Sequence, residues 1–374
     1  MSSIKHNKYS QSIIPTIRKI NRANFATQAN IEGTCEKYVI MHQTKPKEYI
    51  KFSKIDEVFS EVFSSYILNE IGIPCVSYSF VTEQVAGKLK IGTISSDYSE
   101  GSEFRVSLAS MADSVGMIDR LDIPANIYIN LQKAMVIIEN FCKMDYINLT
   151  NEEKEQIYSL FETQIIADFA LCNSDHHLRN IEFLGFNKNG KKKIELVPMF
   201  DLGQTFRSAN AKMALIFEEI PDKNIEEMRK NGISQAQQNA KCIIDYFRNN
   251  YKTPKELAKN KAFRLLCYFI DYNFSNEIYN FLNSVNNQHR FRNQNYISED
   301  NYYPIISTLI NQFESKLLTK EIIKWESMKS AFEERRSIMY EEFSSDEFLF
   351  DAYKYAKPIE KTTYTQTPQN GFQF

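Results

Sequence analysis

Three side chains that carry oxygen donors, Asp175, Asn180 and Asp201, have the types and spacing of a phosphoryl-transfer site. Asp175 and Asn180 lie five residues apart within the segment 173–180, and Asp201 falls in the later segment 198–203. In such sites one carboxylate orients the attacking hydroxyl, while an amide oxygen and a second carboxylate hold magnesium. The pattern predicts Asp175 as the catalytic base, Asn180 and Asp201 as ligands of Mg2+, and ATP as the phosphate donor.

The elements predicted on either side make this pattern more specific than a bare D-x-x-x-x-N, which turn-forming Asp and Asn residues produce by chance. Apolar residues recur at helical spacing over 157–169, so we expect a helix that ends near Leu171, just before the motif. Strand patterns over 181–186 and 193–199 flank the turn sequence 187–190, which predicts a β-hairpin.

The predicted hairpin brings its two ends together in space. Asn180 precedes its first strand and Asp201 follows its second, so the two side chains can share a metal ion. Gly203 should allow the backbone to turn sharply beneath the phosphates. His176 and His177 lie in the same loop, but two adjacent histidines without further ligands make a poor metal site, so we expect a structural role for them.

A lysine and a glutamate nearer the N-terminus are candidates for holding the nucleotide. Lys51 lies on the predicted strand 48–52, and Glu61 lies on the following helix, beside its apolar stripe. A lysine and a glutamate on a strand and the next helix fix a cation at the α- and β-phosphates of ATP. Glu57, one turn earlier and further from the stripe, is the second choice of partner for Lys51.

Gly33, Thr34 and Lys37 form a candidate phosphate-covering loop at the start of the first predicted strand, over residues 37–42. The loop has a single glycine, so the motif is weak, and an ordinary turn explains it nearly as well. The order of elements along the chain places adenine against backbone groups of residues 94–98.

The predicted elements divide the chain into a sheet-rich and a helix-rich part. Residues 1–100 should hold a small antiparallel sheet packed on one helix, and residues 101–356 a larger, mainly helical region, which together make an α+β fold. A hairpin over 76–85 and 88–95 completes the predicted sheet. Residues 357–374 are rich in Thr, Gln, Pro and Lys and are expected to be disordered.

Two regions carry no functional motif. Residues 1–30 are polar with short apolar stretches. Residues 211–345 contain several helical segments with few glycines or prolines. These helices are candidates for recognising a substrate, binding a partner or completing the larger lobe.

The composition restricts the partners that we expect. The 374 residues suffice for two lobes with a sizeable core. Lys and Arg total 45 against 47 Asp and Glu, which argues against direct nucleic-acid binding driven by bulk charge. The six cysteines form no C-x-x-C pair, so we expect reduced thiols and no zinc. No stretch suits a secretory signal or a membrane span, and we expect a cytoplasmic protein without membrane contact.

Together the motifs resemble those of the HipA-like Ser/Thr kinases, a bacterial branch of the protein-kinase-like superfamily that includes the CtkA-type kinases. The resemblance lies within residues 30–205, and the helical remainder fits in outline. The matched family motifs are a G-x-x-E-K phosphate loop at 33–37, a helical Glu followed by Gly and Pro at Glu61, Gly72 and Pro74, N-x-D-x-H-x-x-N at 173–180, and P-x-F-D at 198–201.

The resemblance implies a two-lobed protein-kinase-like fold that transfers the γ-phosphate of ATP, with magnesium, to Ser or Thr of a protein substrate. In the toxin members of the family, autophosphorylation of a serine just before the phosphate loop inactivates the enzyme. Asn30 holds that position here, and Thr34 is a candidate substitute. The toxins are neutralised by a small DNA-binding antitoxin, so the resemblance also implies a small antitoxin-like partner, which the matched residues do not identify.

Three other functions fit parts of the pattern. Small-molecule phosphotransferases of the aminoglycoside or choline type share D-x-x-x-x-N and the later Asp, but they usually carry His-Gly-Asp where this chain has Asn-Ser-Asp at 173–175. A phosphoinositide kinase needs a polybasic patch for the lipid headgroup, and none lies beside the motif. A non-catalytic pseudokinase or adaptor needs none of Asp175, Asn180 and Asp201.

Overall fold

A computed structural model describes residues 17–20, 27–28, 35–42, 46–53, 55–70, 72–85, 88–120, 127–173, 177–188, 191–205, 222–271 and 321–356. Several predictions fall outside these residues. They concern Gly33 and Thr34 of the phosphate loop, the catalytic base Asp175, its neighbour His176, and the tail 357–374.

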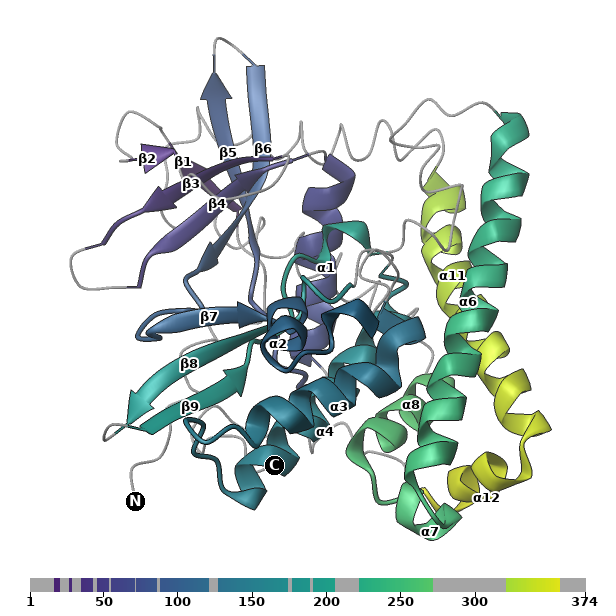
Figure 1. Cartoon of the computed structure of the whole chain (residues 1–374). Coiled ribbons are helices and arrows are strands. Elements are labelled where there is room, and N and C mark those ends of the chain that lie inside the picture. The colour runs from purple at the N-terminus through teal and green to yellow at the C-terminus, as the bar shows by residue number, and fades with distance from the viewer. Residues whose placement is uncertain are drawn as a thin grey trace.

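Six strands form a sheet in the N-terminal part of the chain (Figure 1). Their order across the sheet is β1-β5-β6-β4-β3-β2, and neighbours are antiparallel except for the parallel pair of β1 and β5. The strands are β1 (Ile17–Ile20), β2 (Thr27–Gln28), β3 (Glu36–Ile40), β4 (Glu48–Phe52), β5 (Ser79–Val85) and β6 (Lys88–Ser96). The expected small antiparallel sheet is present, with one parallel strand added at its edge.

The strands β3 to β6 match the four predicted strands to within a few residues at each end. The strands β1 and β2 fall within residues 1–30, where the sequence pattern did not identify individual strands. Both are short, and each is defined by its pairing, β1 with β5 and β2 with β3. A strand of this kind depends on its tertiary partner more than on its own residue pattern, which explains why the pattern does not reveal it.

Helix α1 (Ile55–Glu70) packs against β5 and β6 with its apolar stripe buried. The chain leaves the helix through Gly72, whose φ of +76° suits glycine. The N–H of Ile73 donates to the carbonyl oxygen of Leu68 at 2.8 Å and closes the helix end. The helix therefore ends before Pro74, as predicted.

A second sheet of three antiparallel strands lies beyond the first, in the order β7-β8-β9. Its strands are β7 (Phe104–Ser107), β8 (Glu182–Lys188) and β9 (Lys191–Leu196). The strands β8 and β9 are the predicted hairpin, whereas β7 replaces the start of a region predicted to be mainly helical. The ring of Phe104 lies over Gly185 of β8, and a Cβ at Gly185 would lie 1.9 Å from its Cζ. Only glycine leaves room for this ring.

The other described elements are helices. They are α2 (Leu108–Ser114), η3 (Ile118–Arg120), η4 (Ile127–Asn130), α3 (Leu131–Cys142), α4 (Asn151–Ala170), η5 (Leu202–Gln204), α6 (Asp222–Asn250), α7 (Pro254–Leu257), α8 (Lys261–Asp271), α11 (Glu321–Ser345) and α12 (Glu347–Tyr355). The mainly helical character predicted for residues 101–356 is confirmed over the described residues of this range.

Helix α4 delivers the chain to the predicted catalytic loop. It starts at a capping box, in which the N–H of Glu153 donates to Thr150 Oγ1 at 3.1 Å and the N–H of Thr150 donates to Glu153 Oε2 at 2.8 Å. It ends at Ala170, one residue from the predicted end near Leu171.

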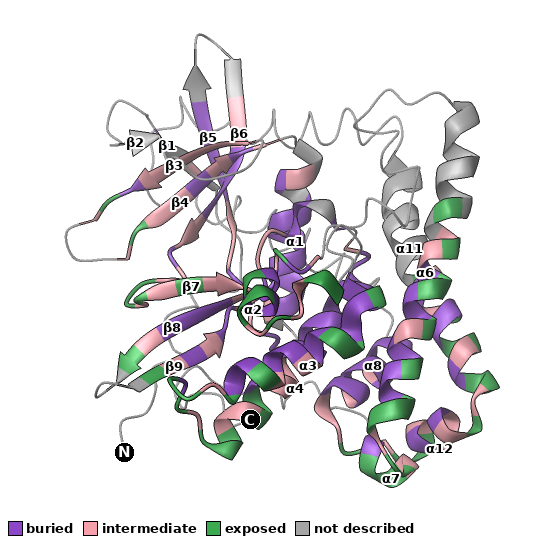
Figure 2. Cartoon of the chain, in the orientation of Figure 1, coloured by how far each residue is buried: buried purple, intermediate pink, exposed green. Residues whose placement is uncertain are grey.

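Buried apolar side chains form two cores (Figure 2). The main core runs through α1, α3, α4, α6, α8, α11 and α12. A smaller core, which includes Ile50, Phe52 and Ile94, lies on the opposite face of the six-stranded sheet. Because side chains alternate between the faces of a strand, Lys51 points away from this small core and toward α1.

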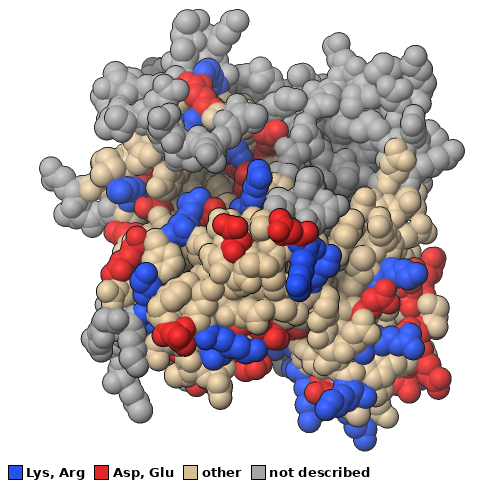
Figure 3. Space-filling view, viewed as in Figure 1, with Lys and Arg blue, Asp and Glu red and all other residues tan. Residues whose placement is uncertain are grey.

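The six-stranded sheet ends at Ser96, close to the predicted lobe boundary at residue 100. The main core continues across this position, so the boundary itself stays a prediction. All six cysteines are described, and none forms a disulfide. Across the described part of the chain, we find no helix with the length and apolar character needed to cross a membrane. On the face shown in Figure 3, basic and acidic side chains are interspersed, in keeping with the balanced charge of the sequence.

Candidate functional site

Lys51 on β4 is held between two carboxylates from distant parts of the chain. Its Nζ donates to Glu61 Oε1 at 2.5 Å and to Asp201 Oδ1 at 2.7 Å. Glu61 lies on α1 and is 1% exposed, whereas Asp201 follows β9 and its side chain is 41% exposed. A strand, a helix and a hairpin therefore converge on one ammonium group, and three of the predicted site residues are brought together.

The strand register explains how Lys51 meets Glu61. Lys51 pairs with Lys37 on β3 and with Thr93 on β6, so these residues form one row across the sheet face that α1 covers. Thr93 Oγ1 donates to Glu61 Oε2 at 2.7 Å. Both oxygens of this buried carboxylate thus accept a hydrogen bond, which a buried charge requires. The same row places the predicted phosphate-binding Lys37 beside Lys51.

The charged groups of this site shift each other's pKa values. Burial lowers the pKa of Lys51, but Glu61 and Asp201 outweigh it, and the pKa of Lys51 is raised. Burial raises the pKa of Glu61, and its hydrogen bonds from Lys51 and Thr93 act against this rise. Burial also raises the pKa of Asp201, but Lys51, together with Lys37, outweighs it and lowers this pKa. At neutral pH Lys51 is therefore a cation and Asp201 an anion.

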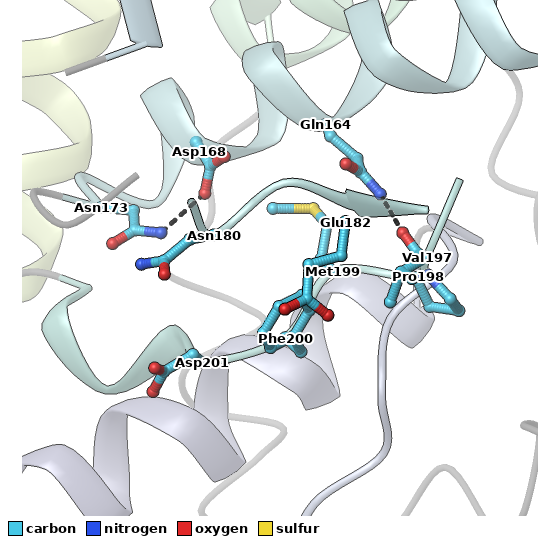
Figure 4. A pocket seen from close by; sticks show the side chains of 10 residues that line it. All are labelled: Gln164, Asp168, Asn173, Asn180, Glu182, Val197, Pro198, Met199, Phe200 and Asp201. Atoms are coloured by element: carbon cyan, nitrogen blue, oxygen red, sulfur yellow. Dashed lines mark hydrogen bonds between the residues drawn. The ribbon is translucent and has the colours of Figure 1, made fainter. Parts of the chain in front are cut away.

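Asn180 and Asp201 line the same pocket (Figure 4). Asn180 precedes β8 and Asp201 follows β9, so both lie at the open end of the hairpin. The pairing of β8 with β9 starts at the turn and reaches Phe183 opposite Leu196, so the two ends of the hairpin stay close together. In Figure 4 both side chains turn toward the opening between α4 and the hairpin. The residues predicted to bind metal therefore share one cavity.

The donor set of this pocket suits magnesium. Mg2+ prefers oxygen ligands and is usually held by one or two carboxylates together with substrate phosphates, not by a complete protein cage. Asn180 supplies an amide oxygen and Asp201 a carboxylate. In the part of the chain that the structure describes, no group of three or more His, Cys, Asp and Glu side chains forms a metal cage. The pair fits a cation that arrives with nucleotide phosphates.

The backbone is strained on both sides of the predicted catalytic segment. Asp201 has φ 53° and ψ 52°, the left-handed conformation, and Cys172 has φ 55°. No other non-glycine residue of the described ranges has a positive φ. Such conformations cost free energy and cluster at functional sites. The sharp turn expected at Gly203 falls on Asp201 instead, because Gly203 lies within the 3-10 turn η5 against α1.

Buried hydroxyl groups fix the segment after Asp201 to α1. Ser60 Oγ donates to the carbonyl oxygen of Thr205 at 3.2 Å, and Ser64 Oγ lies 2.7 Å from Thr205 Oγ1. The same helix carries Glu61. The helix therefore positions both carboxylates that contact Lys51.

Two buried polar side chains of α4, Gln164 and Asp168, also line the pocket, and neither was predicted. Asp168 Oδ1 accepts a hydrogen bond from Asn173 Nδ2 at 2.8 Å, and Gln164 Nε2 donates to the carbonyl oxygen of Val197 at 2.7 Å (Figure 4). Asp168 is 1% exposed and ties α4 to the start of the predicted catalytic loop. The available signal was a polar residue on the apolar face of a predicted helix.

His177 and Glu57, which the sequence analysis considered for the site, make hydrogen bonds that suit a structural role. His177 Nδ1 accepts a hydrogen bond from the N–H of Arg179 at 3.2 Å, which stabilises the loop, as expected. Glu57, the second choice of partner for Lys51, accepts a hydrogen bond from Cys35 Sγ at 3.8 Å.

The segment 94–98, expected to contact adenine, has part of its backbone engaged. The N–H of Asp97 donates to the carbonyl oxygen of Lys47 at 2.7 Å, which extends the pairing of β6 with β4. The ring of Tyr98 stacks on Phe200 with centroids 5.3 Å apart. The segment therefore contacts the chain directly before Asp201.

No family model matches the chain, and no curated protein matches it. Two solved structures are similar to it. One is the proinflammatory kinase CtkA of Helicobacter pylori, with 15% identity and a TM-score of 0.45 over 89% of this chain and 95% of that chain. The other is HipA of Shewanella oneidensis MR-1, a toxin–antitoxin protein solved with HipB and operator DNA, with 10% identity and a TM-score of 0.38 over 87% of this chain and 67% of that chain. Because these identities and TM-scores are low, function has to be argued from the residues of this chain.

Proposed function

We propose that the chain is an ATP- and magnesium-dependent Ser/Thr protein kinase of the HipA-like type. The observation that carries this proposal is the position of Lys51, which donates to Glu61 at 2.5 Å and to Asp201 at 2.7 Å. Asp201 in turn shares a pocket with Asn180. A strand lysine fixed by a helix glutamate holds a cation toward nucleotide phosphates, and a nearby carboxylate and amide suit their magnesium.

Each residue has a definite task in this proposal. Lys51, with Lys37 beside it, binds the phosphates of ATP, and Glu61 orients Lys51. Asn180 and Asp201 hold magnesium, whose positive charge offsets the negative charge of the phosphates. Asp175, which lies outside the described residues, accepts the proton of the attacking Ser or Thr hydroxyl.

The test is transfer of radiolabelled phosphate from ATP, measured as autophosphorylation and on added protein substrates. Asp175→Ala should abolish transfer while ATP binding stays largely intact, because a base acts only on the hydroxyl. Asp201→Ala should abolish transfer and also weaken binding of ATP with magnesium. Undiminished phosphorylation by both variants would show that the site is assigned wrongly.

The same assay separates the competing functions. An aminoglycoside or choline kinase would label the small molecule and not protein, and a phosphoinositide kinase would label lipid. A pseudokinase would bind ATP with magnesium and label nothing. Label on Ser or Thr of protein supports the kinase proposed here.

Two features of regulation also belong to the proposal. Thr34 is the candidate for self-modification, since Asn30 stands where the toxin members of the family have a serine. Mass-spectrometric mapping of the autophosphorylated chain tests this assignment. A small antitoxin-like protein is the proposed partner, and co-purification of such a protein in equal amounts tests it.

A further inference from the structure

A cluster of four side chains, Tyr98, Arg105, Glu182 and Phe200, joins both ends of the β8–β9 hairpin to the segment that connects the two sheets. Tyr98 follows β6, and Arg105 lies within β7. Glu182 begins β8, two residues after Asn180, and Phe200 directly precedes Asp201. Glu182 and Phe200 are thus close in sequence to the proposed magnesium ligands, while Tyr98 follows the first sheet and Arg105 lies on an edge strand of the second.

Arg105 makes the central contacts of the cluster. Its Nε and Nη2 lie 2.7 and 2.8 Å from Glu182 Oε2 and Oε1, a two-pronged ion pair that fixes the guanidinium plane. Its Nη1 donates to the hydroxyl of Tyr98 at 3.0 Å, and its guanidinium carbon lies 5.6 Å from the centre of the Tyr98 ring. The hydroxyl of Tyr98 also donates to Glu182 Oε2 at 3.4 Å.

The other contact of Tyr98 reaches the pocket wall. Its ring is stacked on Phe200, with centroids 5.3 Å apart and planes inclined by 29°. Phe200 and Glu182 both line the pocket that Asn180 and Asp201 share (Figure 4). Glu182 and Phe200 therefore form part of the wall of the proposed magnesium site, and Arg105 and Tyr98 contact them.

The hairpin alone does not fix the separation of the two ligands. Backbone pairing between its strands stops where the N–H of Val197 donates to the carbonyl oxygen of Glu182 at 2.9 Å. Beyond this point the chain bonds to the N-terminal part: the N–H of Met199 donates to the carbonyl oxygen of Pro74 at 3.0 Å, and the N–H of Asp201 to the hydroxyl of Tyr78 at 3.3 Å. The positions of Asn180 and Asp201 are therefore determined by contacts with different parts of the molecule.

We propose that Tyr98 and Arg105 are positioning residues that set the distance between Asn180 and Asp201 and thereby the affinity of the site for a divalent cation. Arg105 acts on the Asn180 side through Glu182, and Tyr98 acts on the Asp201 side through Phe200. The contact between Arg105 and Tyr98 links the two sides. This inference rests on the proposed function, because it assigns a metal to the pair.

The ion pair itself supports the same role for Arg105. Without Arg105, the carboxylate of Glu182 would lose both arms of its ion pair, and its side chain would move. This movement would displace the start of β8 and, with it, Asn180.

The test measures binding of Mn2+, used as a probe for the magnesium site, in the presence of ADP by the electron paramagnetic resonance signal of unbound Mn2+. Tyr98→Leu removes the stacked ring, and Arg105→Met removes the ion pair while keeping an unbranched side chain. Each should weaken Mn2+ binding about tenfold, the usual effect of losing a residue that orients a metal ligand. Tyr98→Phe keeps the ring and Arg105→Lys keeps the charge, so each should lose about threefold or less.

Arg105 is 47% exposed, so its variants should fold, and circular dichroism checks this. A second readout is the Mg2+ concentration for half-maximal autophosphorylation, which should rise in the same order while the KM for ATP at saturating Mg2+ stays near that of the wild type. Unchanged Mn2+ binding in folded Tyr98→Leu and Arg105→Met would overturn this inference alone. A wild-type chain that binds no Mn2+ with ADP would overturn the proposed function as well.

Discussion

Lys51 Nζ lies 2.7 Å from Asp201 Oδ1, although 150 positions separate the two residues in the sequence. The same ammonium group lies 2.5 Å from Glu61, whose carboxylate is buried. The contact joins β4 of the N-terminal sheet to the residue segment that follows β9 of the hairpin. Removing these three charged side chains from water costs desolvation free energy, which specific contacts between them have to offset.

Replacement of Lys51 should therefore harm both activity and stability. Lys51→Met leaves the 1% exposed Glu61 without its cation, which should lower the free energy of unfolding by about 3 kcal/mol. Phosphate transfer should be lost. The double variant Lys51→Met/Glu61→Gln should regain most of the stability but none of the activity, because it removes the uncompensated charge without restoring the cation. Urea unfolding and radiolabel transfer measure the two effects.

Lys90 offers a matched control on the same sheet. Its ion pair with Glu36 has side chains that are 41% and 31% exposed, so Lys90→Met should cost about 0.5 kcal/mol. Phosphate transfer should stay within twofold of wild type, about the scatter that such a surface change produces. If Lys51→Met lowered the free energy of unfolding no more than Lys90→Met, the ion pair between Lys51 and Glu61 would not contribute the stability predicted here.

Regular elements explain why the sequence alone could predict that Lys51 lies near Glu61 and that Asn180 lies near Asp201. Each lies on a strand, on a helix or at the end of a hairpin, so the local pattern names the element that carries it. The ends of a hairpin are neighbours by construction, and a strand followed by a helix places its residues on a known face. The left-handed backbone of Asp201 was not foreseen, because the sequence pointed to Gly203 as the residue with conformational freedom.

Local sequence patterns could not predict contacts between residues whose elements come together only in the tertiary fold. Tyr98 and Arg105 contact two residues that line the pocket, Phe200 and Glu182. Arg105 reaches Glu182 because β7 pairs with β8, with Arg105 opposite Leu184. The four residues of β7 alternate between apolar and polar, but so short a run does not identify a strand before its partner is known. Asp168 lies on the apolar face of its predicted helix, which indicates burial, but its place beside the pocket depends on how α4 packs against β9.

The hydroxyl of Thr93 should control the pH dependence of the site. Thr93→Val keeps the shape but removes the donor to Glu61 Oε2, which lies 2.7 Å away. Burial already raises the pKa of Glu61, and loss of this hydrogen bond raises it further. Because ionised Glu61 holds Lys51, the acidic limb of the pH–activity profile should move to higher pH. Thr93→Ser keeps the hydroxyl and should leave the limb near its wild-type position.

The same substitution has a defined effect on stability. A carboxyl group whose pKa is higher in the folded chain than in the unfolded chain takes up protons on folding, so its contribution falls as the pH rises through the folded pKa. Thr93→Val should therefore cost about 1.5 to 3 kcal/mol at pH values above the folded pKa of Glu61, where the carboxyl group is ionised, and less below that pKa. Equal losses above and below that pKa in urea unfolding would mean that the hydroxyl does not act through the charge of Glu61.

Asp201 should show a conflict between function and stability. Its backbone has φ 53°, a conformation that glycine adopts without strain. Asp201→Gly relieves this backbone strain but loses the ion pair with Lys51, so its free energy of unfolding should stay within about 1 kcal/mol of wild type, while binding of Mn2+ with ADP is lost. Asp201→Val also removes the carboxylate but places a β-branched residue at positive φ, so it should be the less stable variant. Thermal unfolding of the two proteins gives the comparison, and a more stable Asp201→Val would show that the backbone is not strained.

The C-terminal helix α11 should affect phosphate transfer through Arg335. This residue is 6% exposed, and its guanidinium lies 5.2 Å from the centre of the Phe169 ring near the end of α4. Burial raises the pKa of the Cys172 thiol, and Arg335 acts in the opposite direction through its charge and a hydrogen bond. Cys172 immediately precedes Asn173, so Arg335 holds the point at which the chain enters the predicted catalytic loop.

Arg335→Met should lower the autophosphorylation rate at saturating ATP by about tenfold to a hundredfold, because small displacements of reacting groups have effects of that size. The KM for ATP should stay near the wild-type value, since Lys51 and Glu61 lie on other elements. Arg335→Lys keeps a cation beside the Phe169 ring and should recover part of the rate. Arg336→Met changes the next, partly exposed residue of the same helix and should leave the rate unaffected. If Arg335→Met lost thermal stability but kept the wild-type rate per folded molecule, Arg335 would support the fold without positioning the loop.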